Sequence, residues 1–340
     1  MNFEGHRRAP DGRSSTPRDR DRHPRPDRRG SAVSPRRVTS ASIALVVLLL
    51  AGAAAPSGAG TAAPEGRQSS VLNAHPAGPQ PLPADVRPAL SNASTDRESI
   101  AADGCTLSEL EVQPRSCWFG DKASVITVAL VGDSHAAQWF PALERIARAR
   151  GWRLVTFTKV SCRFVDLRIY SRTLKREYTE CERWRAIVVK RLVALAPALV
   201  IVGSSGGMAP MVVGDTDPRR QGQGMARLLR PVKSPIALLV DTPWWTVDVP
   251  TCIARHQQDV RACELARPVA LTWAHGIAER TAAALSSATL VDLTRAICPF
   301  DPCPVVLDKM IIYRDAFHLT ATFAASLAPR IEALLPKPRH

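Results

Sequence analysis

Short apolar segments alternate with stretches suited to helices over most of the chain after residue 123, and this alternation is the strongest constraint on the fold. The apolar segments have the length and the Val, Ile and Leu content of buried strands, and lie at 124–131, 152–158, 199–202, 236–240 and 289–293. Helices are expected between and after them at 136–150, 181–196, 268–284 and 320–335. Strands joined through helices run parallel and are covered on both faces. We therefore predict an α/β fold with a mainly parallel, five-stranded sheet, and a hairpin around 305–313.

The amino-terminal part has a different composition. Residues 1–40 contain eleven Arg, five acidic residues and few large apolar side chains, so we expect a disordered basic tail. Residues 41–63 begin with an apolar segment of fifteen residues, which as a helix covers about 22 Å, less than the roughly 30 Å of a bilayer core. The segment is therefore either a signal peptide or a single membrane anchor, with the basic flank on the cytoplasmic side. A Pro- and Ala-rich linker at 64–104 and a domain at 105–338 outside the membrane follow.

The net charge of +14 suggests a nucleic-acid partner, but its distribution does not support one. The tail, with eleven Arg and five acids, holds +6 of the total, and the remaining charge is spread over some 300 residues. No run of Lys and Arg is interleaved with aromatic residues in the way that nucleic-acid surfaces require. We therefore expect no nucleic-acid partner.

All eight cysteines follow the apolar segment and fall into near-neighbour pairs. The simplest pairing joins sequential neighbours and gives four disulfides: Cys105 with Cys117, Cys162 with Cys181, Cys252 with Cys263, and Cys298 with Cys303. Disulfides of this number are typical of an oxidising compartment, which agrees with export. Zinc is the competing interpretation, but there is no C-x-x-C and no Cys pair beside a spaced His pair, so we expect no metal site and no cofactor.

A candidate nucleophile follows the first predicted strand in the sequence Gly132-Asp133-Ser134-His135. Ligands of parallel α/β folds bind at the carboxyl ends of the strands, where the Ser134 hydroxyl is expected to be exposed. The backbone N–H of Ser134 would lie at a helix start, where it can stabilise an oxyanion. Asp and Ser are also favoured there as helix caps, which is the purely structural alternative.

A nucleophilic serine needs a base, and the base needs a group that orients it. Asp315 and His318 are three residues apart on a predicted turn before the last helix, so the carboxylate can hold one imidazole nitrogen while the other faces the serine. Locally, Thr320 capping the helix and His318 packing beneath it would also explain this turn. Neither structural alternative explains why both motifs occur, in the order Ser…Asp-x-x-His.

Together these motifs resemble the SGNH domain that is fused to membrane acyltransferase-3 proteins, a GDSL-type hydrolase domain implicated in O-acylation of envelope glycans. The elements that carry the resemblance are V-G-D-S-H-A (131–136) with Trp139 and Pro141-Ala-Leu, T-K-x-x-C (158–162), C-x-x-W (181–184), D-T-P (241–243), V-P-T-C (249–252), V-D-L-T (291–294) and Y-R-D-x-x-H-L-T (313–320). The resemblance implies a flavodoxin-like, three-layer SGNH-hydrolase fold. It also implies that Ser134 is the nucleophile, His318 the general base and Asp315 its orienting carboxylate.

The sequence departs from the family at the third strand. Many SGNH enzymes carry G-x-N-D there, with the Asn completing the oxyanion hole, whereas this chain has glycines and serines at 203–207. Candidate replacements are Gly203, Ser204 and Ser205, unless this is simply a Gly/Ser loop. His135 and the pair Trp244 and Trp245 are candidates for substrate contact, with packing as the alternative for the tryptophans.

The function we expect is that of an extracytoplasmic serine esterase or O-acyltransferase. It would act on small, acetyl-like esters of a cell-envelope carbohydrate through an acyl-serine intermediate, and the residues do not distinguish water from a sugar hydroxyl as acceptor. Because the chain has at most one membrane segment, residues 41–63, a separate membrane acyltransferase would supply the acyl group of a transferase. The alternative is a non-catalytic glycan-binding or assembly module that retains the fold.

Overall fold

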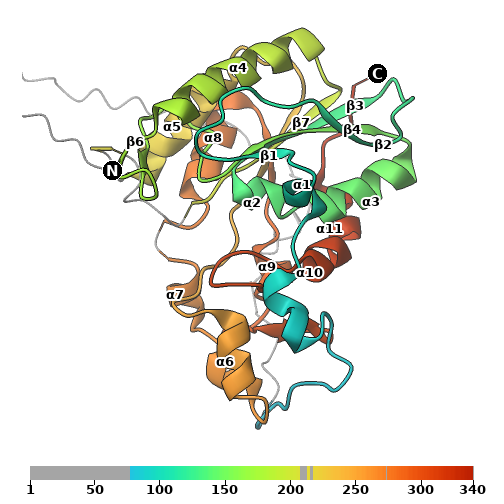
Figure 1. The fold of residues 1–340 in the computed structure, drawn as a ribbon, viewed down its shortest axis with the longest axis vertical. Coiled ribbons are helices and arrows are strands. Elements are labelled where there is room, and N and C mark those ends of the chain that lie inside the picture. The colour runs from blue at the N-terminus through green and yellow to red at the C-terminus, as the bar shows by residue number, and fades with distance from the viewer. Residues whose placement is uncertain (1–76, 207–212, 215–216, 273, 340) are drawn as a thin grey trace, which may run out of the picture. The chain divides into compact units, whose positions relative to one another are not determined.

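The computed structural model describes residues 77–206, 213–214, 217–272 and 274–339, shown in colour in Figure 1. The predicted basic tail, the apolar segment 41–63 and the first part of the predicted linker lie outside the described residues. In the part that is described, no helix combines the length and the apolar character needed to cross a membrane.

A parallel sheet forms the centre of the domain. The five predicted strands are β3 (Thr127–Gly132), β4 (Arg153–Lys159), β7 (Leu199–Gly203), β8 (Ile236–Leu239) and β9 (Thr289–Val291). They are ordered β4-β3-β7-β8-β9 and every neighbouring pair is parallel. Counted along the chain this order is 2-1-3-4-5, the flavodoxin-like order, in which the topological switch point lies between the first and third strands. The predicted α/β fold is confirmed.

The predicted number of strands was too small, because within the described residues the sheet has seven. β1 (Thr106–Leu107) runs parallel to the end of β4, and β2 (Cys117–Gly120) pairs antiparallel with its start. Two residues are too short to give a sequence pattern, and β2, with the sequence CWFG, lacks the β-branched residues that mark strands. Two further pairs of short strands lie outside this sheet: β5 (Tyr170–Ser171) with β6 (Arg176–Glu177), and β10 (Val306–Leu307) with β11 (Met310–Ile311) in the predicted hairpin.

Helices cover both faces of the sheet (Figure 1). One face is packed by α4 (Thr179–Leu195), α5 (Pro218–Leu229) and α8 (Ile277–Ser286). The other is packed by α2 (Ser134–Ala137), α3 (Phe140–Arg150), α10 (Ala321–Ser326) and α11 (Ala328–Leu334). Successive residues of β3 point to opposite faces of the sheet. Leu130 packs on the face covered by α2, α3, α10 and α11, and Val131 on the face covered by α4, α5 and α8. The arrangement has the three predicted layers.

Several helices differ from the prediction: the one predicted at 136–150 is divided into α2 and α3, and a helix at Val249–Arg255 was not predicted. α5 was missed because its two glycines are poor helix formers, yet Gly222 has a packing role, since a Cβ there would lie 2.4 Å from the Ala278 carbonyl oxygen of α8. The helix predicted at 268–284 is divided into α7 (Arg267–Ala270) and α8. The last predicted helix is divided at Leu327, because Pro329 begins a new helix and cannot continue the old one.

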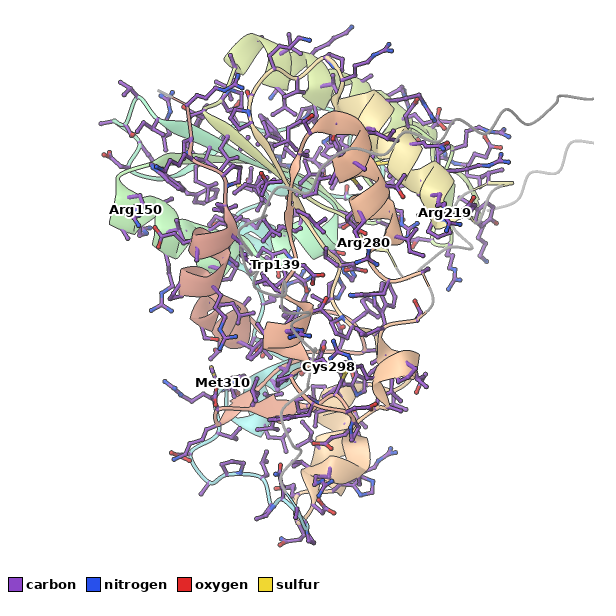
Figure 2. The ribbon with its side chains drawn as sticks, turned by 180° about the vertical axis from the view of Figure 1, so that it is seen from behind. Trp139, Arg150, Arg219, Arg280, Cys298 and Met310 are labelled. Carbon is purple, nitrogen blue, oxygen red and sulfur yellow. A yellow bond between two sulfur atoms is a disulfide. The ribbon has the colours of Figure 1, made fainter. Side chains whose placement is uncertain are left out.

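A smaller part of the domain lies below the sheet in Figure 1 and contains α6, α7 and the β10–β11 hairpin, where Figure 2 labels Met310. There α6 spans Val249–Arg255, and the part also contains η1 (Leu90–Thr95), η3 (Val260–Cys263) and α9 (Thr294–Ile297). The short α1 (Ser99–Ala102) lies beside the sheet, next to β1 (Figure 1). Residues 77–104, which we expected to be linker, are part of this fold. Ala93 and Ile100 are 0% exposed, and the Leu82 N–H donates to the Gln257 carbonyl over 2.8 Å. These few apolar residues lack the periodicity that would have predicted their burial.

The four predicted disulfides are present in the described part of the chain, and no cysteine there is free. Cys105–Cys117 joins β1 to β2, and Cys162–Cys181 joins the segment after β4 to α4. Cys252–Cys263 joins α6 to η3, and Cys298–Cys303 closes a short loop after α9. Each bond therefore restrains a local connection, two beside the sheet and two in the smaller part of the domain.

Candidate active site

Ser134 lies at the switch point of the sheet, in the turn from β3 into α2. Gly132 makes this turn with φ +144°, and a Cβ at this position would be 1.8 Å from the Gly203 carbonyl oxygen of β7. Gly203 is similarly restricted, because its Cβ would lie 2.9 Å from the Cα of Ala136. Two glycines on adjacent strands thus let α2 approach the sheet and bring Ser134 to its carboxyl edge.

Asp133 holds this turn in place. Its buried carboxylate accepts the His135 N–H over 2.9 Å, and so caps α2. The same carboxylate accepts the Ser205 N–H at 3.0 Å and the Ser205 hydroxyl at 2.8 Å. The structural interpretation as a cap therefore holds for Asp133, which also fixes the loop after β7 against the serine turn.

The predicted Ser134, His318 and Asp315 form one chain of hydrogen bonds. The His318 Nε2 is 2.9 Å from the Ser134 Oγ, and its Nδ1 is 2.7 Å from the Asp315 Oδ2. The other oxygen of Asp315 accepts the N–H groups of Phe317 and His318 at 2.8 and 2.7 Å. The Thr320 hydroxyl caps α10, as the local alternative had suggested, but His318 is directed to the serine.

Gln138 of the segment between α2 and α3 links the two ends of this chain of hydrogen bonds. Its Oε1 accepts the Leu319 N–H over 2.9 Å, next to His318, and its Nε2 donates to the His135 carbonyl over 3.3 Å. The turn that carries His318 is thereby attached to the helix that carries Ser134, although the two residues are far apart in the sequence.

The electrostatic surroundings favour a neutral base and an ionised orienting group. Burial lowers the pKa of His318; the hydrogen bond that His318 donates to Asp315 opposes this, and the charges of His135 and Arg314 lower it further. Burial would raise the pKa of Asp315, but the hydrogen bond and charge of His318, with the two backbone N–H groups, lower it to about 2. A carboxylate at Nδ1 selects the tautomer whose Nε2 lone pair faces the serine hydroxyl.

A second histidine–aspartate pair lies beside the first. The His135 Nδ1 is 2.5 Å from the Asp241 Oδ1, and both side chains are 3% exposed. The His135 ring lies nearly parallel to those of Trp244 and Phe317, and its centroid is 4.8 Å from that of His318. Burial opposes a charge on His135, but Asp241, with Asp133 and Asp315, raises its pKa above the ordinary value. These three carboxylates therefore favour the charged form of His135.

Asp241 is a site residue that was not predicted from the sequence. It follows β8 directly, at the carboxyl edge of the sheet, and this position in the D-T-P motif was the available signal. Besides His135, its carboxylate accepts the Gly206 N–H at 2.6 Å and the Trp244 Nε1–H at 2.8 Å. Burial raises its pKa, but the charge and hydrogen bond of His135 outweigh this and keep the pKa well below its usual range. Asp241 thus orders the loops after both β7 and β8.

Of the four oxyanion candidates, Gly203 and Ser205 are used by the fold, and Ser204 is used as an acceptor. Gly203 is paired with both β3 and β8, and the Ser204 hydroxyl accepts the Phe164 N–H over 2.9 Å. Both donors of Ser205 point to Asp133. The Ser134 N–H has no hydrogen-bond partner among the described residues, and it cannot have one within α2 because it is the first residue of that helix. The Ser134 N–H is therefore the first candidate donor for an oxyanion, and the Ser204 hydroxyl, which within the described chain only accepts a hydrogen bond, is the second.

The two candidate tryptophans have different surroundings. Trp244 is half-buried and stacks on Phe317, with 4.7 Å between ring centroids, so it forms a wall of the site. Trp245 is 5% exposed, packs against Tyr313 and donates from Nε1 to the Cys263 carbonyl over 2.9 Å. Its expected contact with substrate is therefore replaced by a place in the core.

Two more charged side chains are buried behind the loop after β7, and the sequence analysis missed both. The Arg163 guanidinium donates to the Gln221 Oε1 over 2.8 Å and to the Ser205 Oγ over 3.3 Å. Glu279 of α8 is buried nearby, and burial together with the charge of Asp241 raises its pKa to about 7. The site therefore rests on a network of buried charges.

The comparisons with known proteins agree with this geometry. The profile of the family described as SGNH domain (fused to AT3 domains) matches residues 104–333. The periplasmic domain of the lipopolysaccharide acetyltransferase of Salmonella ser. Paratyphi A has a similar structure, with a TM-score of 0.52 and 13% identity over 73% of this chain and 97% of that one. A GDSL-like lipase from Bacteroides thetaiotaomicron has a TM-score of 0.37 and 13% identity over 62% and 89%. No curated protein sequence matches significantly. The match to the profile covers more than half of the chain, which therefore belongs to the SGNH domain family whose members are fused to AT3 domains.

Proposed function

We propose that this protein is an extracytoplasmic serine esterase or O-acyltransferase that acts on acetyl-like esters of a cell-envelope glycan. The observation that carries the proposal is the connected arrangement of Ser134, His318 and Asp315, with 2.9 Å between hydroxyl and imidazole and 2.7 Å between imidazole and carboxylate. These distances are those required for proton transfer from a nucleophile to an oriented base.

The reaction begins when the Ser134 Oγ attacks the carbonyl carbon of the ester and His318 Nε2 takes the hydroxyl proton. The carbonyl oxygen becomes an oxyanion, to which the Ser134 N–H donates. Collapse breaks the bond to the leaving alkoxide, which receives the proton from His318 and departs as an alcohol. Asp315 stays ionised and stabilises the imidazolium.

The second half of the reaction repeats these steps with a different nucleophile. A water molecule or a sugar hydroxyl attacks the acyl-serine, and His318 takes its proton. Collapse of the second tetrahedral intermediate returns the proton to the Ser134 oxygen and releases acetate or the acylated sugar. Neither half needs an oxidant, a metal or an organic cofactor, because every proton is moved by His318.

Two observations support the location and the substrate class. Four disulfides are typical of proteins outside the cytoplasm. The structurally similar Salmonella protein is described as a periplasmic domain of a lipopolysaccharide acetyltransferase, which favours an envelope carbohydrate as acceptor. As a transferase, the protein would receive the acyl group from a separate membrane acyltransferase, with residues 41–63 as the membrane contact or export signal.

The test is the release of p-nitrophenol from p-nitrophenyl acetate, compared between the wild type, Ser134→Ala and Ser91→Ala. Ser91 is exposed and provides a matched control. We expect Ser91→Ala to match the wild type and Ser134→Ala to lose about 10³-fold or more in kcat, as when a triad member is removed. Adding a sugar acceptor separates the two activities, because a transferase forms acetylated sugar at the expense of acetate. Equal rates for Ser134→Ala and the wild type would contradict the acyl-serine.

A non-catalytic glycan-binding module is the second candidate, and the engagement of both Ser205 donors by Asp133 favours it. One oxyanion donor, where removed from an enzyme, accounts for roughly 2.7–4 kcal/mol of transition-state stabilisation. A fluorophosphonate probe separates the candidates, since it labels a serine only when the neighbouring base activates it. Labelling of Ser134 supports the enzyme, and folded protein without labelling supports the binding module.

A further inference from the structure

A basic cavity lies beyond the aromatic wall of the active site. It has a volume of about 590 Å³ and is lined by three arginines, Arg267 before α7, Arg280 of α8 and Arg295 of α9, together with His275, Thr294 and Asp292. Figure 2 labels Arg280, where the sheet and the smaller part of the domain meet. We call this cavity the arginine pocket. Three guanidinium groups face a single carboxylate there.

Among the described residues, the arginine side chains of the pocket make no direct ion pairs with carboxylates. In the part of the chain that the structure describes, no carboxylate lies within ion-pair distance of the Arg267, Arg280 or Arg295 side chains. Arg267 donates instead to the carbonyl and sulfur of Cys298, and Arg280 to the His275 carbonyl over 2.5 Å. Asp292 accepts the Thr294 N–H over 2.9 Å.

The arginines also repel one another. Burial lowers the pKa of Arg267 and the charge of Arg295 lowers it further, while the charges of Asp301 and Asp292 oppose both effects. Burial lowers the pKa of His275 as well; the charges of Asp241 and Asp292 oppose this, and those of Arg280 and Arg267 add to it. An anion in the pocket would relieve this repulsion, and the planar guanidinium group matches the oxygens of a phosphate or carboxylate.

The pocket is connected to the active site through Trp244. The Trp244 N–H donates to the Ala270 carbonyl of α7 over 2.9 Å, and the Trp244 ring stacks on Phe317, next to His318. Ser134 follows β3 and Asp292 follows β9, three strands away in the sheet order. At about 4.8 Å per strand, the two sites are roughly 14 Å apart, within reach of one oligosaccharide.

We propose that the arginine pocket binds a phosphate or carboxylate group of the glycan whose hydroxyl reacts at Ser134, so that the substrate is an acidic oligosaccharide. This assignment rests on the proposed function. The anionic group would anchor the chain beyond Trp244 and place a neutral sugar unit at the nucleophile.

Binding is tested by calorimetry with inorganic phosphate, D-glucuronate and neutral D-glucose. The variants are Arg280→Gln with Arg295→Gln, and as matched control Arg219→Gln with Arg230→Gln, which removes two exposed arginines of α5 and its C-cap. We expect phosphate or glucuronate, but not glucose, to bind the wild type and the control, and to bind the pocket variant roughly 10- to 100-fold more weakly. Absence of anion binding to the wild type, or equal affinity for the pocket variant, overturns the proposal.

Further measurements test anion binding to the arginine pocket independently of variant folding and of catalysis. Phenylglyoxal modification of the wild type, mapped by mass spectrometry, should be slowed by phosphate at Arg280 and Arg295 but not at Arg219; uniform modification overturns the assignment. Ser134→Ala should bind the anion as tightly as the wild type. Anion binding to the arginine pocket can therefore be tested even if the proposed acyl chemistry fails. The last measurement is binding of the protein to phosphatidylglycerol vesicles in the presence of phosphate or glucuronate. Vesicle binding that neither anion displaces would indicate a lipid surface as the partner and would also overturn the proposal.

Discussion

Replacing His135 tests whether the second histidine sets the acidity of the first. In His135→Asn the amide can still donate to Asp241, but the positive charge 4.8 Å from the His318 ring is lost. At an effective dielectric constant of about 20, two unit charges at this distance interact by about 3.5 kcal/mol, or roughly 2.5 pKa units. Solvent at the site reduces the effect, so we expect the pKa of His318 to rise by roughly 1 to 2 units.

The sign follows from the groups around His318. Burial and the charges of His135 and Arg314 lower its pKa, while Asp315 raises it. Removing one of the lowering charges lets the imidazole take up a proton at a higher pH, and the protonated ring cannot act as a base. As the pH is lowered, kcat/KM of the variant should therefore begin to fall at a higher pH than that of the wild type. The plateau of kcat/KM at alkaline pH should change little.

The assay is kcat/KM for p-nitrophenyl acetate between about pH 4.5 and 8.5, with the product measured after an alkaline quench. The midpoint of the acidic limb reports the essential base of the free enzyme. His256→Asn is the matched control, because His256 is exposed and belongs to α6 only as its C-cap. A midpoint that stays in place or moves to lower pH in His135→Asn would refute the electrostatic coupling between the two rings.

Three further predictions concern the orienting group, a buried acid and a disulfide. Asp315→Asn should lower kcat by about 10³- to 10⁴-fold with little change in KM, because an amide can hold the wrong imidazole tautomer; a KM effect alone would contradict this role. Glu279 has a pKa of about 7 in the folded protein, above its ordinary 4.5, so folding loses stability as pH rises between these values. Glu279→Gln should accordingly be more stable than the wild type by up to about 3 kcal/mol at pH 8 and show no gain at pH 4, measured by urea unfolding. Replacing both Cys162 and Cys181 by Ser should remove about 3 kcal/mol of stability, as expected for a bond spanning 19 residues; an unchanged urea midpoint would show that the unfolded chain is not restrained there.

The parts of the fold that the sequence predicted are those with strong local patterns. The apolar runs that became β3, β4, β7, β8 and β9 were recognised because their β-branched residues and flanking helices repeat the same unit. β2 was not predictable in this way, since its place beside β4 depends on pairing with distant residues and on the Cys105–Cys117 bond. Burial of Ala93 and Ile100 likewise depends on contacts with residues far along the chain.

The candidate site shows the same division. Ser134, Asp315 and His318 were identified because each belongs to a short motif whose spacing has chemical meaning. Asp241 was not, because a single Asp after a strand has many structural uses and its pairing with His135 joins two loops. The fate of Ser204 and Ser205 also depended on partners elsewhere in the chain, Phe164 and Asp133.

The order of the disulfides along the chain has a consequence for how the protein acquires them. The bonds span 12, 19, 11 and 5 residues, and none encloses or overlaps another. A chain that emerges from its amino end into an oxidising space would present each cysteine's partner before the next pair arrives. If oxidation keeps pace with emergence, no more than two thiols are free at once, and there is no competing partner. Of the 105 ways in which eight cysteines can pair, emergence in this order selects the native one without reshuffling.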